Sequence, residues 1–317
     1  MNNEEELLEE KELLEEQAGF EMLGQAIEMN STRTMSLSFT STGLRTSELK
    51  YRCINADDRL AETFLVNSRL LRNELESTAS MLHYFEEPVT KMLSLPRGNA
   101  QTSQKKIFLP KRLDLNVFLG DAIVNRKSVR QYTGDDIPLD FLATILFAAG
   151  GVTHKATTTL ATGEEVELKF RSPPSGGGLY PIDLAVMVNN VRGLAKGIYK
   201  YDGDQHILAP WLGADDADAV LRTMAFPEEV ISAQRSSAII LLIARPWRSM
   251  RKYGTRGMRL VFMESGYISQ NIHLSTQALG FGSVDCSGMY DDELNKAIKL
   301  DGVFSTVVHS ILIGCPE

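Results

Sequence analysis

Three short segments carry residue types that could bind a ligand or move protons. The first, Arg126-Lys-Ser128-Val-Arg130, places two guanidinium groups and a hydroxyl at alternate positions, so that an extended backbone would point all three one way. Guanidinium groups form bidentate, charge-assisted hydrogen bonds with phosphate, and this segment could therefore hold a phosphorylated cofactor. The alternative is an ordinary solvated basic surface, because a pattern of so few residues is only weakly specific.

The second segment is rich in glycine and proline and runs from Arg171 to Pro181 with the sequence RSPPSGGGLYP. Three glycines behind a Pro-Pro-Ser turn allow the backbone to approach a flat ligand and to present N–H groups to it. The spacing matches neither a dinucleotide fingerprint nor a P-loop, and a purely structural turn is the alternative. A further glycine pair, Gly280 and Gly282, follows a predicted helix and could simply cap it.

The third segment, residues 245–259, packs five arginines and Lys252 between a predicted strand and a predicted helix. A lysine can act as a base when burial or neighbouring cations lower its pKa, and the phenol of Tyr253 can donate or accept a proton. The alternative is an exposed basic loop that aids solubility or contacts between subunits.

The elements that must position these segments follow from apolar periodicity. Short apolar runs predict buried strands over 182–188, 238–244 and 303–313, and residues 197–211 predict a hairpin. Helical spacing predicts helices over 139–149, closed by Gly150 and Gly151, and over 256–279. Strands and helices without a regular βαβ series indicate an α+β fold.

The amino-terminal third differs in composition from the rest of the chain. Eight Glu and one Lys within residues 1–16 supply −7 of the net charge of −8, which leaves −1 for the other 301 residues. A nearly neutral body argues against a nucleic-acid binder. The acidic opening predicts either a fraying terminus or a short docking helix, residues 59–85 predict a second helix, and PRGNAQTSQKK predicts a linker. We therefore predict a helical extension over 1–110 and a second domain over 111–317.

The composition also bears on location and cofactors. No apolar run reaches the roughly 20 residues of a membrane span, and the acidic amino terminus is unlike a secretory signal, so we expect a cytoplasmic protein that contacts no membrane. Three cysteines and five scattered histidines show no metal-ligand spacing, and we expect neither a disulfide framework nor a bound metal.

Taken together, the motifs resemble those of the nitroreductase-like flavoproteins, and within them the SagB/ThcOx-type azoline dehydrogenases, the branch that includes the microcin B17 enzyme. The resemblance covers residues 120–317. It rests on Arg126-x-Ser128-x-Arg130, GGVT at 150–153, RSPPSGGGLYP, GIYKYD, Lys252-Tyr253 followed by RGMR, MESGYISQNIHL and LGFGS, in this order. It implies a mixed, mainly antiparallel sheet flanked by helices, and a homodimer with FMN at the subunit interface.

The resemblance also implies roles for individual residues. One basic segment would contact the phosphate, the ribityl chain and the pyrimidine edge of FMN, and the glycine segments would lie along its ring system. Many simple nitroreductases add a basic phosphate ligand in a tail, but this sequence stops at Glu317, so either another group supplies that charge or phosphate binding is weaker. The implied cofactor ligands are Arg126, Ser128, Arg130, Pro174, Ser175, Gly176, Gly177, Gly280 and Gly282, with Gln270 and Asn271 as further candidates.

For catalysis, the resemblance implies that Lys252 is the base and that Tyr253 orients the ring or shares the proton. The expected substrate is an azoline-containing precursor peptide, oxidised from thiazoline or oxazoline to thiazole or oxazole during biosynthesis of a bacteriocin-like peptide. The expected partners are cyclodehydratase proteins, with residues 1–110 as a docking region. A generic FMN reductase of nitro compounds or quinones that uses NAD(P)H, and a flavin-free scaffold subunit, are the alternatives.

Overall fold

The computed structural model describes residues 60–69, 84, 106–159 and 165–317. The chain divides into two units, residues 1–73 and 74–317, which are treated separately. In the first unit, helix α3 spans Leu60–Asn67. It lies within the helix predicted over 59–85, and the rest of that helix, the acidic opening and most of the predicted linker fall outside the described residues.

The second unit is built on a seven-stranded sheet in the order β1-β6-β5-β4-β7-β9-β8, and every neighbouring pair of strands is antiparallel. The central strands β4 (Ile182–Val188) and β7 (Ala238–Ala244) are almost wholly apolar, because both of their faces are covered. The remaining strands are β1 (Ile107–Phe108), β5 (Gly197–Asp202), β6 (Ile207–Leu212), β8 (Gly282–Asp285) and β9 (Thr306–Gly314).

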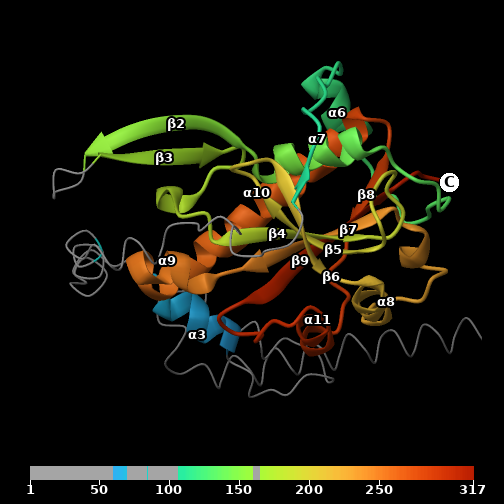
Figure 1. Ribbon diagram of the computed structural model, residues 1–317. Coiled ribbons are helices and arrows are strands. Elements are labelled where there is room, and N and C mark those ends of the chain that lie inside the picture. Colours follow the sequence, from blue (N-terminus) through green and yellow to red (C-terminus); the bar gives the residue numbers. More distant parts are fainter. Residues whose placement is uncertain (1–59, 70–83, 85–105, 160–164) are drawn as a thin grey trace, which may run out of the picture. The chain divides into compact units, whose positions relative to one another are not determined.

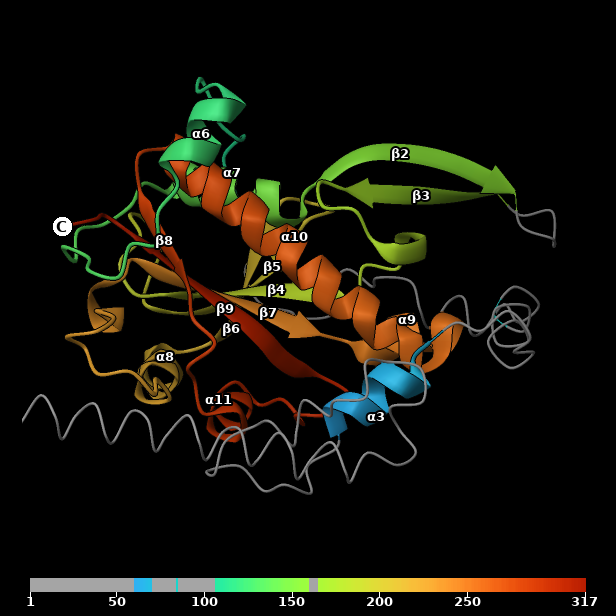
Figure 2. The same cartoon turned by 180° about the vertical axis from the view of Figure 1, so that it is seen from behind.

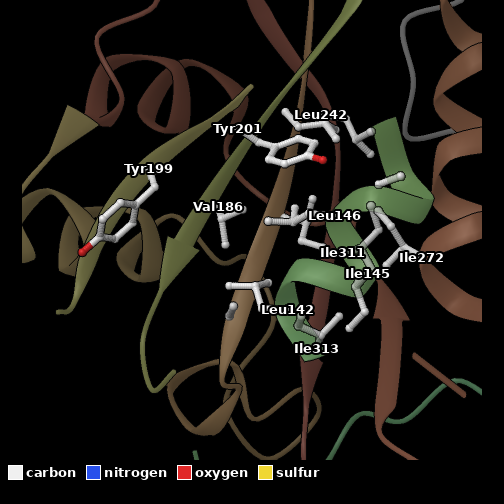
Figure 3. Close-up of a cluster of buried hydrophobic side chains, with 14 of the residues drawn as sticks. Leu142, Ile145, Leu146, Val186, Tyr199, Tyr201, Leu242, Ile272, Ile311 and Ile313 are labelled. Atoms are coloured by element: carbon white, nitrogen blue, oxygen red, sulfur yellow. The ribbon is translucent and has the colours of Figure 1, made fainter. Parts of the chain in front are cut away.

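Helices cover both faces of this sheet (Figure 1). On one face lie α7 (Leu139–Gly150) and the long helix α10 (Gly257–Ala278), whose apolar residues pack on the strands with Leu142, Leu146 and Ile272 fully buried. Figure 3 shows this cluster. On the other face lie α8 (Ala214–Arg222) and α11 (Asp291–Ala297). Each large apolar side chain buried in this way contributes roughly 1.5–3 kcal/mol to folding.

The elements with strong apolar periodicity form where the sequence predicts them. The predicted strands over 182–188 and 238–244, the hairpin and both helices are confirmed, and so is the mainly antiparallel α+β sheet. The end of α10 is closed by Gly280 at φ +81°, where the N–H groups of Gly280 and Phe281 bond the carbonyls of Gln277 and Thr276. This pair of bonds is a Schellman motif, which requires a left-handed residue and so favours glycine.

Other elements differ from the prediction. The last strand begins at Thr306 rather than Val303, because the Asp301 carboxylate accepts the N–H groups of Val303 and Ser305 and holds a turn there. A separate hairpin, β2 (Val152–Thr159) with β3 (Glu165–Arg171), extends away from the main sheet in Figure 1. β3 alternates the apolar residues Val166, Leu168 and Phe170 with charged ones, a period-two signal that none of the predictions above used, whereas β2 is mostly polar and gives no such signal.

Within the residues that the structure describes, no helix is both long and apolar enough to cross a membrane.

Candidate active site

The glycine segment and the Lys252–Tyr253 pair meet at one end of the sheet. Residues 172–181 form the loop that leads into β4, while β7 leads directly into α9 (Pro246–Tyr253). Because β4 and β7 are antiparallel neighbours with Ile182 opposite Ala244, the start of one strand and the end of the other lie side by side. The segments predicted to flank the ring and to carry the base are therefore adjacent.

Their contact is close enough to require glycine. Gly177 adopts φ +67°, and a Cβ built on it would overlap the Tyr253 hydroxyl and lie 3.0 Å from Lys252 Nζ. A Cβ on Gly176 would lie 2.8 Å from Leu260 Cδ1 of α10. These two glycines therefore allow the loop to pack directly against the end of α9 and the beginning of α10.

The loop, referred to below as the glycine loop (residues 172–181), is held in shape by its own polar groups. Ser175 Oγ accepts the Tyr180 N–H at 2.8 Å, and Tyr180 Oη accepts the Arg171 N–H at 2.9 Å. Arg248 donates to the Tyr180 carbonyl at 3.1 Å. Tyr180 itself has φ 46°, an uncommon conformation for a residue with a side chain, so these bonds hold a backbone that would otherwise relax.

Helix α9 is anchored by a carboxylate at the start of β4. Asp183 accepts Arg245 Nε at 3.0 Å and both terminal nitrogens of Arg248, at 2.5 and 3.1 Å. Burial tends to raise the pKa of Asp183, but the charges and hydrogen bonds of Arg248 and then Arg245 outweigh burial, and the pKa lies below its ordinary value. The interpretation of residues 245–259 as an exposed basic loop is thus wrong for these two arginines, because they position a helix.

Burial shapes the acid–base behaviour of the pair at the end of α9. It lowers the pKa of the Lys252 ammonium, which favours the neutral amine, and it raises the pKa of the Tyr253 phenol, which keeps it protonated. Lys252 Nζ also lies 5.1 Å from the ring centroid of Tyr84 and 5.3 Å from that of Tyr253. A lysine with a lowered pKa beside a protonated phenol can serve as a base and a hydrogen-bond donor.

The basic segment around Ser128 lies elsewhere, along the edge strand β8. Ser128 forms a parallel bridge with Ser283, and the Val129 N–H donates to the Ser283 carbonyl at 3.0 Å. A Cβ on Gly282 would lie 2.6 Å from the Val129 side chain, so Gly282 has a packing role here. Arg126 directly follows α6 (Leu119–Asn125), and neither Arg126 nor Arg130 forms a salt bridge with a described residue.

Among the remaining predicted ligands, Gly280 and Asn271 have structural roles, whereas Gln270 and Pro174 are exposed. Gly280 caps α10, which is the alternative that its position left open. Asn271 Nδ2 donates to the Ala148 carbonyl at 2.9 Å and ties α10 to α7, while Gln270 is exposed on α10. Pro174 is an exposed residue of the glycine loop. Whether any of these residues contacts a cofactor stays a prediction.

The predicted site residues therefore fall into two groups at different ends of α10. Leu260 touches the glycine loop, whereas His273 Nδ1 lies 2.8 Å from Ser283 Oγ, next to Ser128. The 13 residues between these contacts correspond to about 20 Å along a helix. Figure 2 shows α10 running from the region of α6 to α9. The basic segment and the glycine loop therefore lie near opposite ends of α10.

Three functional residues were missed in the sequence. Asp183 lies within the predicted apolar strand over 182–188. Tyr84 lies within the predicted helix over 59–85, where nothing in the pattern marks it as special. Glu264 is 2% exposed on α10, although it is charged. A signal for it existed, because Glu264 shares the buried face of the predicted helix with Val261 and Ile268, three and four residues away.

Comparison with known proteins identifies the family. The nitroreductase family model matches residues 123–314, and the chain belongs to this family. Nitroreductase-family proteins are oxidoreductases that typically bind FMN.

Individual relatives agree with this assignment. A protein of Methanocaldococcus jannaschii with a provisional nitroreductase name is 35% identical over 187 residues, which cover 57% of this chain and 84% of the relative.

Among solved structures, one of a nitroreductase-like protein from Ralstonia eutropha matches with a TM-score of 0.54 at 24% identity, and it covers 70% of this chain and 95% of that one. The Escherichia coli microcin synthetase McbBCD complex with truncated pro-MccB17 bound matches with a TM-score of 0.50 at 18% identity, over 78% of this chain and 100% of the matched chain. At these identities the two structures establish the fold alone.

Proposed function

We propose that this protein is an FMN-dependent dehydrogenase that oxidises thiazolines and oxazolines in a precursor peptide to thiazoles and oxazoles. The observation that carries the proposal is the contact between the glycine loop and the Lys252–Tyr253 pair, with the pKa of Lys252 lowered by burial. A simple reductase that passes hydride from a nicotinamide to a substrate has no evident need for a lysine base at this position.

The residues present are suited to FMN. Arg126 and Arg130 offer guanidinium groups that are not engaged in salt bridges with described residues, and the Ser128 hydroxyl lies exposed between them in the sequence. Such a set of donors is what a phosphate monoester requires. The glycine loop, with Pro174 to Gly177, is the complementary part that would lie along the ring system. Bound FMN would supply a hydride acceptor.

The division of these groups supports a homodimer as the working form. A two-fold related pair would bring the basic segment of one chain beside the glycine loop of the other. Large apolar side chains on α6 and α10, and at Phe118 just before α6, are exposed in the single chain, with Phe118 84% and Phe262 51% exposed. Exposed apolar surface of this kind favours association, and we propose a second copy of this chain as its occupant. The other large apolar side chains exposed on these two helices are Leu119, Ile123, Val124, Met263 and Tyr267.

In this arrangement, side chains of the protein itself would accept the proton and orient the substrate ring. Aromatisation of an azoline removes a proton and a hydride from the five-membered ring. The neutral amine of Lys252 would take the proton, and the protonated phenol of Tyr253 would donate a hydrogen bond that orients the ring against the glycine loop. The arginine pair on Asp183 fixes α9 and so fixes both side chains relative to that loop.

The proposed peptide substrate and partners draw on the microcin synthetase likeness. That complex carries a bound pro-peptide and contains several proteins, which supports an azoline peptide as substrate and cyclodehydratase proteins as partners here. Residues 1–110 remain the proposed docking region.

The test is oxidation of an azoline peptide by the purified, flavin-loaded protein without nicotinamide. We expect mass spectrometry to show the loss of two hydrogens per ring, with oxygen as the final electron acceptor.

The name of the Methanocaldococcus relative favours a generic reductase as second candidate. Rapid bleaching of the bound flavin by NADPH, with no loss of hydrogen from the peptide, would establish that candidate instead. A colourless protein that refuses added FMN would indicate a scaffold.

A further inference from the structure

A polar cluster joins the edge strand β8 to α10 beside the basic segment (residues 126–130), and no step proposed above uses it. Asp285 of β8 is its centre. The carboxylate accepts the Ser269 hydroxyl at 2.5 Å, His309 Nε2 at 2.6 Å and His273 Nε2 at 2.9 Å. Ser269 and His273 come from α10, and His309 comes from β9, so donors from two elements converge on one side chain of the edge strand.

The charge of Asp285 determines the direction of these hydrogen bonds. Burial tends to raise the pKa of Asp285, but the hydrogen bonds of His273, His309 and Ser269 outweigh burial, and the pKa lies well below its ordinary value. An ionised carboxylate can only accept, so each imidazole donates through its Nε2–H. Nδ1 of a neutral imidazole is then an acceptor, and Nδ1 of His273 lies 2.8 Å from Ser283 Oγ, whose hydroxyl donates to it. His273 is thus engaged at both ring nitrogens.

The two partners of His273 are alternate residues of one strand. Side chains at positions i and i+2 of a strand point to the same face and lie about 7 Å apart, because each residue advances the strand by about 3.3 Å. Ser283 and Asp285 stand in this relation, and the buried imidazole of His273 bridges them. A slip of β8 by one residue would place Gly282 and Val284 on this face instead and would break both bonds. His273 therefore defines the register of β8 against α10.

The basic segment depends on β8 for its position. β8 has four residues and pairs with β9 along one edge. Along its other edge, Ser128 forms the parallel bridge with Ser283, and the Ser283 carbonyl accepts the Val129 N–H at 3.0 Å. Ser283 is therefore held by His273 through its hydroxyl, and it holds the basic segment through its carbonyl.

We propose that His273 is a positioning residue of the proposed cofactor site, which clamps β8 through Ser283 and Asp285 and thereby fixes the basic segment that would bind the FMN phosphate. Hydrogen bonds to a charged group are stronger than neutral ones, so the bond to Asp285 suits His273 to hold an edge strand as short as β8. The cofactor role of His273 rests on the proposed function, whereas the clamp rests on the contacts alone.

Two measurements on the full chain test the proposal. Hydrogen–deuterium exchange of the fragment covering residues 127–131 reports on the Val129 N–H, and titration with FMN, followed by flavin fluorescence, reports cofactor affinity. His273→Leu keeps a side chain of similar size without its two hydrogen bonds. We expect exchange in this fragment to become about tenfold faster and FMN binding about tenfold weaker, the lower end of the scale for a lost hydrogen bond to a charged group.

His309→Leu is the matched control. It also removes an Nε2 hydrogen bond to Asp285, but His309 Nδ1 lies near Ser287 Oγ and not near Ser283. Exchange of the 127–131 fragment and FMN affinity should both stay within about threefold of wild type, because Ser269 and His273 still hold Asp285. A general loss of stability would affect both variants alike, and melting temperatures measured on each show its size.

Unchanged exchange in His273→Leu, faster exchange with unaltered FMN affinity, or an equal loss of affinity in His309→Leu would overturn the proposal. If His273→Leu does not fold, Ser283→Ala removes only the hydroxyl that His273 holds, and it should speed exchange and weaken FMN binding in the same direction. A wild-type protein that refuses FMN while its variants show the expected exchange would reject the proposed function together with the cofactor role of His273. Only the clamp on β8 would then remain.

Discussion

Substitution of two adjacent glycines separates backbone strain from the placement of the proposed catalytic pair, Lys252 and Tyr253. Gly177 and Gly178 both have φ +67°. A Cβ on Gly177 would overlap the Tyr253 hydroxyl and lie 3.0 Å from Lys252 Nζ, whereas the nearest atom to a Cβ on Gly178 is Phe170 Cε1 at 4.0 Å. Alanine at either position therefore carries the same strain, but only Gly177→Ala pushes on the pair.

The expected magnitudes follow from this geometry. A left-handed alanine costs about 1–2 kcal/mol, so both variants should melt a few degrees below wild type, by about 2–8 °C. In Gly177→Ala the new methyl group must displace the Tyr253 hydroxyl by about 1 Å and Lys252 Nζ by less, and misplacement on the scale of about 1 Å can reduce turnover by about 10²-fold. Gly178→Ala should remain within about threefold of wild type.

Calorimetry, flavin content and azoline oxidation measured on both variants provide the assay. Equal losses of turnover in the two variants would mean that strain in the loop, and not contact with the pair, controls the reaction. Full activity in Gly177→Ala would refute the account, because it would show that the loop does not determine where Lys252 and Tyr253 lie.

Substitutions at Lys252 and Asp183 test the proposed base and the anchor of α9. Lys252→Ala and Lys252→Arg should both retain flavin and lose about 10²–10⁴-fold in turnover, because neither supplies a neutral amine; activity in the arginine variant would show that only the positive charge matters. Asp183→Asn should destabilise the protein by about 2–3 kcal/mol, somewhat below the value for a fully buried ion pair, since 21% of the Asp183 side chain is exposed. Because the folded pKa of Asp183 is lowered, its contribution to stability is complete above the unfolded pKa of about 3.9 and is lost as the pH falls through the folded pKa. The difference in melting temperature between Asp183→Asn and wild type should therefore shrink in acid. Asp136→Asn, which breaks the exposed pair with Arg192, is the control and should leave the melting temperature nearly unchanged; an equal effect of both substitutions would contradict the anchoring role.

Local patterns in the sequence predicted the framework well, for a physical reason. Strands β4 and β7 are apolar over their whole length because helices cover both sheet faces, and α10 carries a periodic stripe closed by Gly280. Burial on this scale leaves continuous apolar runs and periodic stripes that can be read from the sequence. The β2–β3 hairpin shows alternation only in β3, at Val166, Leu168 and Phe170, and this signal is shorter and weaker than the apolar runs of the central strands.

The assembly of the site was harder to predict, because it depends on contacts between distant parts of the chain. Gly177 and Lys252 are 75 positions apart in the sequence, and only the pairing of Ile182 with Ala244 brings their segments together. Helix α9 was obscured by its arginines, which resemble a solvated loop until Asp183 is seen to bind two of them. The separation of Arg126 from the glycine loop likewise follows from the length of α10.

Intersubunit complementation tests the central claim that one flavin site is built from two chains. Arg126→Ala removes a phosphate ligand from the basic segment and Lys252→Ala removes the base beside the glycine loop, so each homodimer should be inactive, and the first should also lack flavin. A mixed dimer, isolated through two different affinity tags, would contain one intact site and one site with both changes. We expect it to oxidise azolines at about half the wild-type rate. A mixed dimer as inactive as its parents, or a monomer that binds FMN and is active alone, would contradict the account.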